Sequence, residues 1–298
     1  MKEIRIISPS GVIDPAYIDG AAARLRAWGF RVSEGAHARD TRGRFAGCDE
    51  DRLADLVEAL NDRSVDAVLC SRGGYGLQRI IDRVPPITKP VIGFSDITAL
   101  HQVAAMSGQP SVHGIMCKHI ATLPEESEPI QALRRLLDGE AMHYQWESHP
   151  LNRLGVAEGK IIGGNLSVLY GLQGTEYDLR SIEDLRFKIE DCKPILLIED
   201  VGERHYHIDR MMRNLRMSGV LSHLGGLIVG QFSECEDDEL MGCTVYETIK
   251  EAVADYDYPV LFNAPVGHVE RNLPLVLNVP ARMEITTSSA LIDADGIA

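Results

Sequence analysis

Three residue types in this 298-residue sequence could together perform acyl-transfer chemistry: a serine, a carboxylate and a histidine. Ser95, Glu199 and His268 each follow an apolar, strand-like run of residues, either directly or after a short loop. A serine hydroxyl becomes a nucleophile when a histidine accepts its proton and a buried carboxylate holds that histidine in the required tautomer. Ligands of open parallel sheets bind beyond the carboxyl ends of strands, so we expect all three side chains to lie at such ends.

Ser95 lies in a strand-to-helix turn within the segment 91–98. Gly93, two residues earlier, permits the tight approach of a nucleophile elbow, and the backbone N–H of Asp96 would point toward an oxyanion. The hydrolase pattern G-x-S-x-G needs a second glycine where this chain has Ile97. Spacing alone therefore leaves open a second interpretation, in which Ser95 is only the N-cap of the following helix.

Glu199 and His268 also have alternative interpretations. A carboxylate after the apolar run 195–198 could orient an imidazole, or it could be an exposed charge at a strand end. His268 could accept the serine proton, but the chain holds ten histidines, and any one of them can be structural. The order serine, acid, histidine is that of the α/β hydrolases, although triads occur in every order.

A glycine-rich turn, Ser71 to Gly76, follows another apolar run. Its glycines let the backbone approach a ligand closely, so the N–H of Gly74 could be a second oxyanion donor. Arg72 could bind a substrate carboxylate through two parallel hydrogen bonds. A phosphate site has less support, because neither G-x-G-x-x-G nor a lysine followed by serine or threonine accompanies the turn.

His205, His207 and Asp209 have a spacing that resembles a metal site. Residues two apart on a helix point in different directions, and no third strong ligand is nearby, so we interpret them as part of a solvated helix. The sequence therefore predicts neither a metal nor another cofactor.

The pattern of apolar residues predicts two domains. The first half alternates strand-like and amphipathic runs, as a parallel sheet covered by helices does. We expect strands at Ile4–Ser8, Phe30–Ser33, Val65–Cys70 and Val91–Gly93, with helices at Ala16–Trp28, Glu50–Leu60 and Asp96–Met106.

In the second half we expect strands at Gly155–Ile162, Ile195–Ile198, Gly226–Phe232, Pro259–Phe262 and Leu273–Val279, and two helices at Ile208–Met217 and Thr244–Ala254. The polar segment 123–154 predicts a helix and a connection, so we place a doubly wound α/β domain over 1–150 and a strand-rich α+β domain over 151–298.

The composition of the chain indicates which binding partners and which cellular compartment to expect. The formal net charge of -14 repels phosphate backbones, so we expect no binding to nucleic acid or to an anionic membrane surface. The six cysteines, at positions 48, 70, 117, 192, 235 and 243, include no pair with a two-residue gap, and we expect them to be reduced. Charges interrupt the first residues and no apolar run could span a bilayer, so we expect a cytoplasmic protein.

Seven motifs, in order, resemble those of the LD-carboxypeptidases, the muramoyltetrapeptide carboxypeptidase family of serine peptidases. They are Ser8-Pro9-Ser10, Ser71 to Gly76, Gly93 to Leu100, His113-Gly114, Gly163 to Ser167, Leu197 to Glu203 with Ile208 to Arg210, and Gly267-His268. The likeness covers nearly the whole chain. Ile115 departs from the pattern, since the family usually has proline after His-Gly.

The resemblance implies a flavodoxin-like N-terminal domain with Ser95 and a β-rich C-terminal domain with Glu199 and His268, with an active site between them in a homodimer. It implies a serine carboxypeptidase that hydrolyses an L,D peptide bond and releases the terminal D-alanine of cytoplasmic murein tetrapeptide during cell-wall recycling. Members of the family also cleave microcin C-type peptidyl nucleotides, so this self-immunity reaction is an alternative. A third hypothesis is a non-enzymatic peptide-binding protein on the same fold.

Overall fold

A computed structural model describes residues 2–181 and 193–297 of the chain, and these form two compact units. The first unit contains the chain up to Glu140 together with Leu273–Asn278 and Ile297. The second contains Ala141–Asn272 and Val279–Gly296. The segment 273–278, which the sequence pattern placed with the C-terminal strands, therefore belongs to the first unit.

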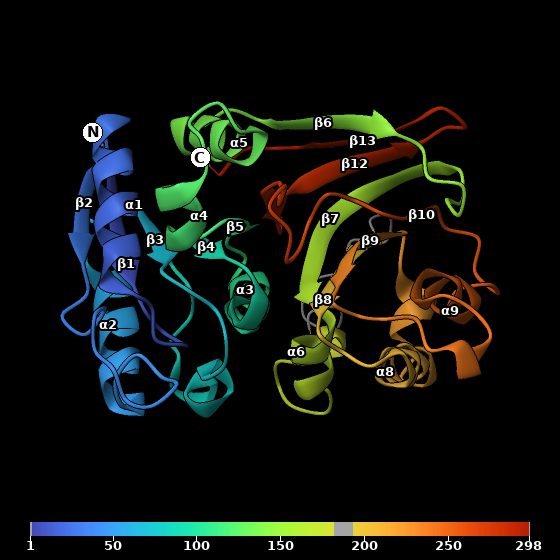
Figure 1. Ribbon diagram of the computed structural model, residues 1–298, viewed down its shortest axis with the longest axis horizontal. Helices are drawn as coiled ribbons and strands as arrows, with labels where there is room; N and C mark the ends of the chain where they lie inside the picture. The colour runs from blue at the N-terminus through green and yellow to red at the C-terminus, as the bar shows by residue number, and fades with distance from the viewer. Residues whose placement is uncertain (1, 182–192, 298) are drawn as a thin grey trace. The chain divides into compact units, whose positions relative to one another are not determined.

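The first unit is built on a six-stranded sheet in the order β11-β5-β4-β3-β1-β2 (Figure 1). Its strands are β1 (Glu3–Ile7), β2 (Arg31–Glu34), β3 (Ala67–Cys70), β4 (Val91–Gly93), β5 (Ser111–His113) and β11 (Leu275–Leu277). Strands β1 to β5 are parallel, and their order 2-1-3-4-5 is that of flavodoxin. The expected flavodoxin-like fold class is confirmed, and β11 adds an antiparallel edge strand beside β5.

Helices and 3-10 turns connect these strands (Figure 1). They are α1 (Pro15–Ala27), α2 (Asp49–Asn61), η1 (Leu77–Arg79), η2 (Ile81–Arg83), η3 (Ser95–Ile97), α3 (Thr98–Ser107), α4 (Cys117–Thr122) and α5 (Glu128–Asp138). The Asp14 side chain accepts the N–H of Ala16 at the start of α1, and Cys48 and Asp51 form a capping box at α2. Because β1, β3 and β4 are parallel, the loops that follow them lie at one edge of the sheet, and these loops contain the serine and glycine motifs.

The second unit is built on a seven-stranded mixed sheet in the order β10-β9-β8-β7-β12-β13-β6 (Figure 1). Its strands are β6 (Met142–Glu147), β7 (Gly155–Asn165), β8 (Ile195–Val201), β9 (Gly226–Ser233), β10 (Val260–Leu261), β12 (Pro280–Ile285) and β13 (Ser289–Ala294). Its described helical segments are α6 (Leu166–Gly171), α8 (His205–Met217), η4 (Val220–His223), η5 (Glu239–Met241) and α9 (Val245–Ala252). Strands β7 to β10 are parallel and the others pair antiparallel, so the expected strand-rich α+β unit is confirmed.

The sequence pattern missed several short elements. The segment 142–147, expected to be part of a connection, is strand β6, in which Met142 and Tyr144 are buried and His143 and Gln145 are exposed. Strands β5, β12 and β13 and helices α4 and α6 were not expected either. Glu199 lies inside β8 and not after it, because the strand continues to Val201.

Five cysteines lie in the described part of the chain, and all five are free thiols, as expected. Cys192 lies outside the described residues. Within residues 2–181 and 193–297, no helix is both long and apolar enough to cross a membrane.

Candidate active site

Ser95 has a backbone conformation that is uncommon for a residue with a side chain. Its φ is 66°, in the left-handed region, at the point where β4 gives way to the 3-10 turn η3. The cap positions of η3 and α3 are Phe94 and Ile97, and neither makes a side-chain cap hydrogen bond. The N-cap interpretation of Ser95 is therefore wrong. A strained residue at the carboxyl edge of a parallel sheet is instead typical of a nucleophile elbow.

Two glycines allow this turn to form. A Cβ on Gly93 would lie 2.9 Å from Ile97 Cγ1, so the glycine before the serine lets the helix start pack onto the strand. A Cβ on Gly73 would lie 2.7 Å from Ser95 Cβ and 3.0 Å from Ser95 Oγ. The glycine-rich turn thus passes directly beside the serine hydroxyl, as the proposed oxyanion role of Gly74 requires.

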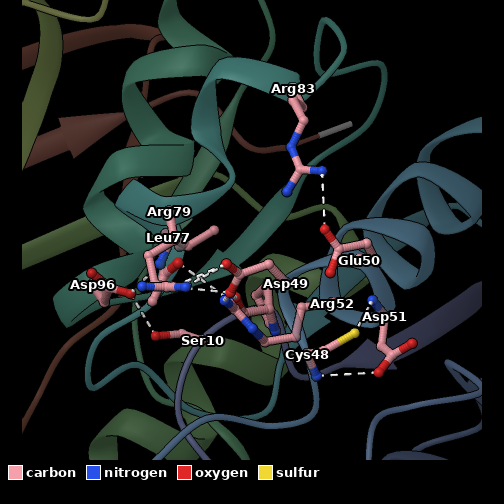
Figure 2. Close-up of polar contacts among 12 residues, drawn as sticks. Ser10, Cys48, Asp49, Glu50, Asp51, Arg52, Leu77, Arg79, Arg83 and Asp96 are labelled. Carbon is pink, nitrogen blue, oxygen red and sulfur yellow. Dashed lines mark hydrogen bonds and ion pairs between the residues drawn. The ribbon is translucent and has the colours of Figure 1, made fainter.

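The carboxylate of Asp96 connects the serine turn to two other loops. It is buried, and its Oδ2 accepts hydrogen bonds from Ser10 Oγ (2.5 Å) and from the backbone N–H of Leu77 (2.9 Å), as Figure 2 shows. Ser10 follows β1, and Leu77 directly follows the glycine-rich turn, as the first residue of η1. Asp96 therefore fixes the position of both loops relative to Ser95.

His101 of α3 supports the elbow from within the core. Its Nε2 lies 3.0 Å from the carbonyl oxygen of Gly93, and the ring is almost fully buried. Burial, with the neighbouring His113, lowers the pKa of His101 to about 3. The ring is therefore neutral at pH 7, and because a carbonyl can only accept, Nε2 carries the hydrogen and donates it.

Gly74 and Arg72 lie on the exposed surface of the glycine-rich turn. Gly74 has a φ of 102°, which a residue with a side chain adopts only with strain. Arg72 donates one hydrogen bond from Nη1 to the carbonyl of Val12, at 2.6 Å. The exposure of both residues is compatible with contact to a substrate, and their roles remain predictions.

The structure brings Glu199 and His268 together in the second unit. Glu199 Oε2 lies 2.8 Å from His268 Nδ1; the carboxylate side chain is 0% exposed and the imidazole side chain is 20% exposed. The alternative interpretation of Glu199 as an exposed strand-end charge is therefore wrong. A carboxylate that accepts the Nδ1 hydrogen leaves Nε2 as the basic nitrogen, which is the tautomer a general base needs.

Opposing influences set the pKa of His268. Burial lowers the pKa, but the hydrogen bond and charge of Glu199, with the charges of Asp200 and Glu234, outweigh burial. The net effect raises the pKa of His268 above its ordinary value of 6.5. The imidazolium formed when the ring takes up a proton is thus stabilised, as catalysis by a general base requires.

A β-bulge places Glu199 beside His268. Ile198 pairs with Val229 and Asp200 with Phe232, so β9 has two residues, Gly230 and Gln231, opposite the single residue Glu199. A Cβ on Gly230 would lie 3.1 Å from Glu199 Cβ and 2.5 Å from the carbonyl oxygen of Val266. The missing side chain at 230 thus leaves room for the loop that carries the histidine.

Gly267 has the same function immediately before the histidine. Its φ is 127°, and a Cβ there would lie 2.8 Å from Glu199 Oε2. Its N–H donates to Asn272 Oδ1 at 2.9 Å. Glycine at 267 therefore satisfies both the backbone conformation and the close approach to the carboxylate.

Asp200 points into a separate network beside this pair. Its carboxylate accepts hydrogen bonds at 2.9 Å from Asn165 Nδ2 and from the backbone N–H groups of Ser167 and Val201. Burial, with the charge of Glu199, raises the pKa of Asp200 to about 7, although these donors act in the opposite direction. Asp200 therefore connects β8 to the start of α6 and is not a second orienting group for His268.

His205, His207 and Asp209 have different partners. His205 is buried, bonds Thr248 Oγ1 through Nε2 (2.7 Å), and accepts the N–H of Asp238 at Nδ1 (3.2 Å). His207 pairs with Glu203 and Asp209 with Arg213. The three side chains do not converge, and the expectation that all of them are solvated is wrong for His205.

Three residues that support the loops around the serine could not be identified from the sequence: Ser10, Arg52 and His101. Ser10 was part of a family motif, but its bond to Asp96 depends on the fold. Arg52 and His101 lie on helices, where nothing in the sequence distinguishes a buried polar residue from a solvated one. Only the structure distinguishes them: both are almost fully buried, Arg52 bonds carbonyl groups of two loops near Ser95, and His101 bonds the carbonyl group at the end of β4.

Comparison with protein families assigns both halves of the chain. A family model described as the LD-carboxypeptidase N-terminal domain matches residues 4–114, and one described as the LD-carboxypeptidase C-terminal domain matches residues 158–283. The chain belongs to the LD-carboxypeptidase family. The resemblance found in the sequence motifs is thus confirmed, and with it the assignment of the chain as a peptidase.

Individual members of the LD-carboxypeptidase family agree with this assignment. The chain is 32% identical over 98% of its length to the "Probable murein peptide carboxypeptidase" of Bacillus subtilis, of which 91% is covered. It superposes on the crystal structure of muramoyltetrapeptide carboxypeptidase from Oxalobacter formigenes with a TM-score of 0.86, at 25% identity and with 99% of each chain covered. The microcin C7 self-immunity protein MccF in complex with aspartyl sulfamoyl adenosine shares the fold, with a TM-score of 0.81, 20% identity, and coverage of 99% and 96%.

Proposed function

We propose that this LD-carboxypeptidase is a serine peptidase that releases the terminal D-alanine of murein tetrapeptide. The observation that carries the proposal is the buried 2.8 Å bond between Glu199 and Nδ1 of His268, because it prepares Nε2 to act as a base. The strained backbone of Ser95 supports the role of its hydroxyl as nucleophile. The murein peptidase relatives support the substrate class.

In the proposed mechanism, Ser95 Oγ attacks the carbonyl carbon of the L,D peptide bond while His268 Nε2 accepts its proton. The N–H groups of Gly74 and Asp96 donate to the tetrahedral oxyanion. His268 then gives its proton to the nitrogen of the leaving D-alanine, and the C–N bond breaks to leave an acyl-enzyme. Water, deprotonated by His268, hydrolyses the ester and restores Ser95.

Arg72 has the role of binding substrate in this proposal. A carboxypeptidase must recognise the free carboxylate at the end of its substrate, and a guanidinium offers two parallel N–H groups for it. The exposure of Arg72 on the turn beside Ser95 supports this role. We also propose that the enzyme is a cytoplasmic homodimer. Sedimentation velocity would measure its oligomeric state.

The test is a comparison of wild type with Ser95→Ala on murein tri-, tetra- and pentapeptides, followed by mass spectrometry. We expect wild type to release D-alanine from tetrapeptide, and the variant to lose several orders of magnitude in kcat with an unchanged fold, since removing a triad nucleophile has this effect. Ser64→Ala, which removes an exposed hydroxyl that bonds the nearby Asp62, is the matched control and should retain full activity. Near-normal turnover by Ser95→Ala would reject the mechanism.

A peptidyl nucleotide is the alternative substrate, because the MccF likeness extends over 99% of the chain. An aminoacyl sulfamoyl adenosine belongs in the same assay. Preference for it over tetrapeptide would reassign the substrate and leave the mechanism in place. A chain that cleaves neither compound and whose Ser95 does not react with a fluorophosphonate would be a binding protein.

A further inference from the structure

A buried arginine lies beneath the loops that surround Ser95. Arg52, on α2, is 1% exposed. Its Nη1 donates to the carbonyl oxygens of Pro9 (2.6 Å) and Gly76 (3.1 Å), and its Nη2 donates to Asp49 (2.5 Å), the contact drawn in Figure 2. Removing a guanidinium from water is costly unless its donors are paired, and the bonds of Nη1 and Nη2 offset part of this cost, whereas Nε has no hydrogen-bond partner among the described residues.

The two carbonyls belong to the loops that define the serine site. Pro9 lies in the loop after β1, next to Ser10, and Gly76 ends the glycine-rich turn after β3. The same two loops are joined by the N–H of Gly11, which donates to Gly73 O at 3.0 Å, and by the carboxylate of Asp96. Arg52 therefore adds a third connection between them.

The glycine-rich turn needs such connections. Gly74 and Gly76 have φ values of 102° and 149°, and glycine loses more conformational freedom on folding than any other residue. A Cβ on Gly76 would lie 2.9 Å from Arg52 Nη1, so the guanidinium contacts the backbone where a side chain would otherwise stand. Because these glycines have no side chains to pack, hydrogen bonds must determine the conformation of the turn.

Asp49 orients the guanidinium. Its carboxylate is also bound by Arg79, whose Nε lies 3.0 Å and Nη2 2.7 Å away (Figure 2). The hydrogen bond from Arg79, with that from Arg52, lowers the pKa of Asp49 to about 2, despite partial desolvation. Asp49 is thus ionised at every pH at which the enzyme would act, and it holds Arg52 in one orientation.

We propose that Arg52 is a positioning residue of the oxyanion site, which holds the glycine-rich turn so that the N–H of Gly74 faces the developing oxyanion. This inference rests on the proposed function, in which Gly74 is an oxyanion donor. Arg52 does not touch the substrate, so its loss should weaken binding of the transition state and not binding of the substrate.

The test compares Arg52→Met and Arg52→Lys with wild type, in kcat, in KM, and in amide hydrogen exchange across residues 72–77. For Arg52→Met we expect kcat to fall by about 10²-fold, the scale of losing one oxyanion donor, with KM within about threefold and faster exchange in the turn. Arg52→Lys keeps a cation and one or two donors, so it should recover part of kcat. If Arg52→Met fails to fold, Arg52→Lys still provides the comparison.

Arg5→Met is the matched control. Arg5 is also largely buried and also binds acidic groups at α2, namely Glu58 (3.1 Å) and the C-cap residue Asp62 (2.8 Å), but its hydrogen bonds within the described residues do not involve either loop of the serine site. Its removal should lower the melting temperature and leave kcat and the exchange of the turn unchanged.

Folded Arg52 variants with wild-type kcat, or with unchanged exchange at 72–77, would overturn the inference. Failure of the proposed function is distinguishable, because wild type would then cleave no murein peptide. The exchange measurement, which needs no substrate, would still decide whether Arg52 holds the turn.

Discussion

Replacing Glu199 by glutamine tests the proposed catalytic role of the Glu199–His268 pair with almost no change in side-chain volume. In the native protein a buried carboxylate accepts the Nδ1 hydrogen of His268 at 2.8 Å and raises the pKa of the ring. Glutamine removes the charge and offers both a carbonyl and an amide group to Nδ1. When the amide donates to Nδ1, the hydrogen moves to Nε2, and the ring can no longer accept the proton of Ser95.

The expected effects on rate and on pKa are separate. An asparagine in place of the triad aspartate lowers kcat by about 10⁴ in trypsin through the wrong tautomer, and we expect a loss of about 10²- to 10⁴-fold here. An opposite charge within hydrogen-bonding distance moves a pKa by about 1 to 3 units, each unit worth about 1.4 kcal/mol. Because burial is the largest single influence on His268 and lowers its pKa, loss of the opposing effect of Glu199 should shift the pKa of His268 downward.

The sign of the pH dependence follows from the role of the base. His268 must be neutral to accept a proton, so kcat/KM of wild type should rise with pH through a pKa above 6.5. In Glu199→Gln this acidic limb should move to lower pH, while the plateau falls. The assay is kcat/KM for tetrapeptide between pH 5 and pH 9, with an NMR titration of His268 in both proteins.

Glu203→Gln is the matched control for this change. Glu203 also bonds a histidine Nδ1, that of His207, at 3.0 Å, but this pair lies at the start of α8 and is partly exposed. Its substitution should alter neither the plateau nor the acidic limb. A Glu199→Gln variant with an unmoved limb, or with a plateau equal to that of wild type, would refute the reasoning.

Two further predictions concern local packing. Gly73→Ala would place a methyl group 2.7 Å from Ser95 Cβ and 2.9 Å from the carbonyl oxygen of Phe94. We therefore expect the free energy of unfolding, measured in urea, to fall by about 1–3 kcal/mol. We also expect kcat to fall at least tenfold, which corresponds to about 1.4 kcal/mol of activation free energy. A Gly73→Ala variant with normal kcat would contradict the close approach of the turn. Thr244→Ala removes the capping box of α9 and should cost about 1 kcal/mol of stability with kcat unchanged; a loss of activity would show that α9 influences the site.

The sequence predicted the central strands well for a physical reason. β3, β4 and the first four residues of β8 lie between parallel neighbours and are buried, so their sequences are continuous runs of apolar residues and glycine or cysteine. Strands β12 and β13 alternate buried and more exposed residues and contain charged side chains, which weakens the signal over only six residues. The strand at β11 was expected, but its place in the first sheet could not be predicted, because its partner β5 lies far earlier in the chain and a local pattern does not report such pairing.

The site was only partly predictable. The sequence indicated Ser95, Glu199 and His268 as candidate residues, together with the glycines beside them. It could not indicate the left-handed backbone conformation of Ser95 or the burial of Glu199. An acid after an apolar run is most simply a strand end, and only the bulge opposite Glu199 shows why β8 continues through it. The contacts of Arg52 could not be predicted from the sequence, because its carbonyl partners lie 43 and 24 residues away in the chain.

Glycines and buried polar side chains occur together around Ser95, because a backbone turn rich in glycine must be held by hydrogen bonds to other residues. At Gly73 the turn approaches the Ser95 hydroxyl so closely that a side chain would clash, so apolar packing cannot hold the turn at that point. Its carbonyl and N–H groups must then be held by polar partners, and the buried ends of Arg52 and Asp96 bond Gly76 O and Leu77 N. A buried polar group left without its partner costs about 1–3 kcal/mol, and more if charged. We therefore expect the loss of one of these contacts to change the conformation of the turn. In the proposed mechanism, the precision of the oxyanion site at this edge of the sheet thus depends on buried residues that do not contact the substrate.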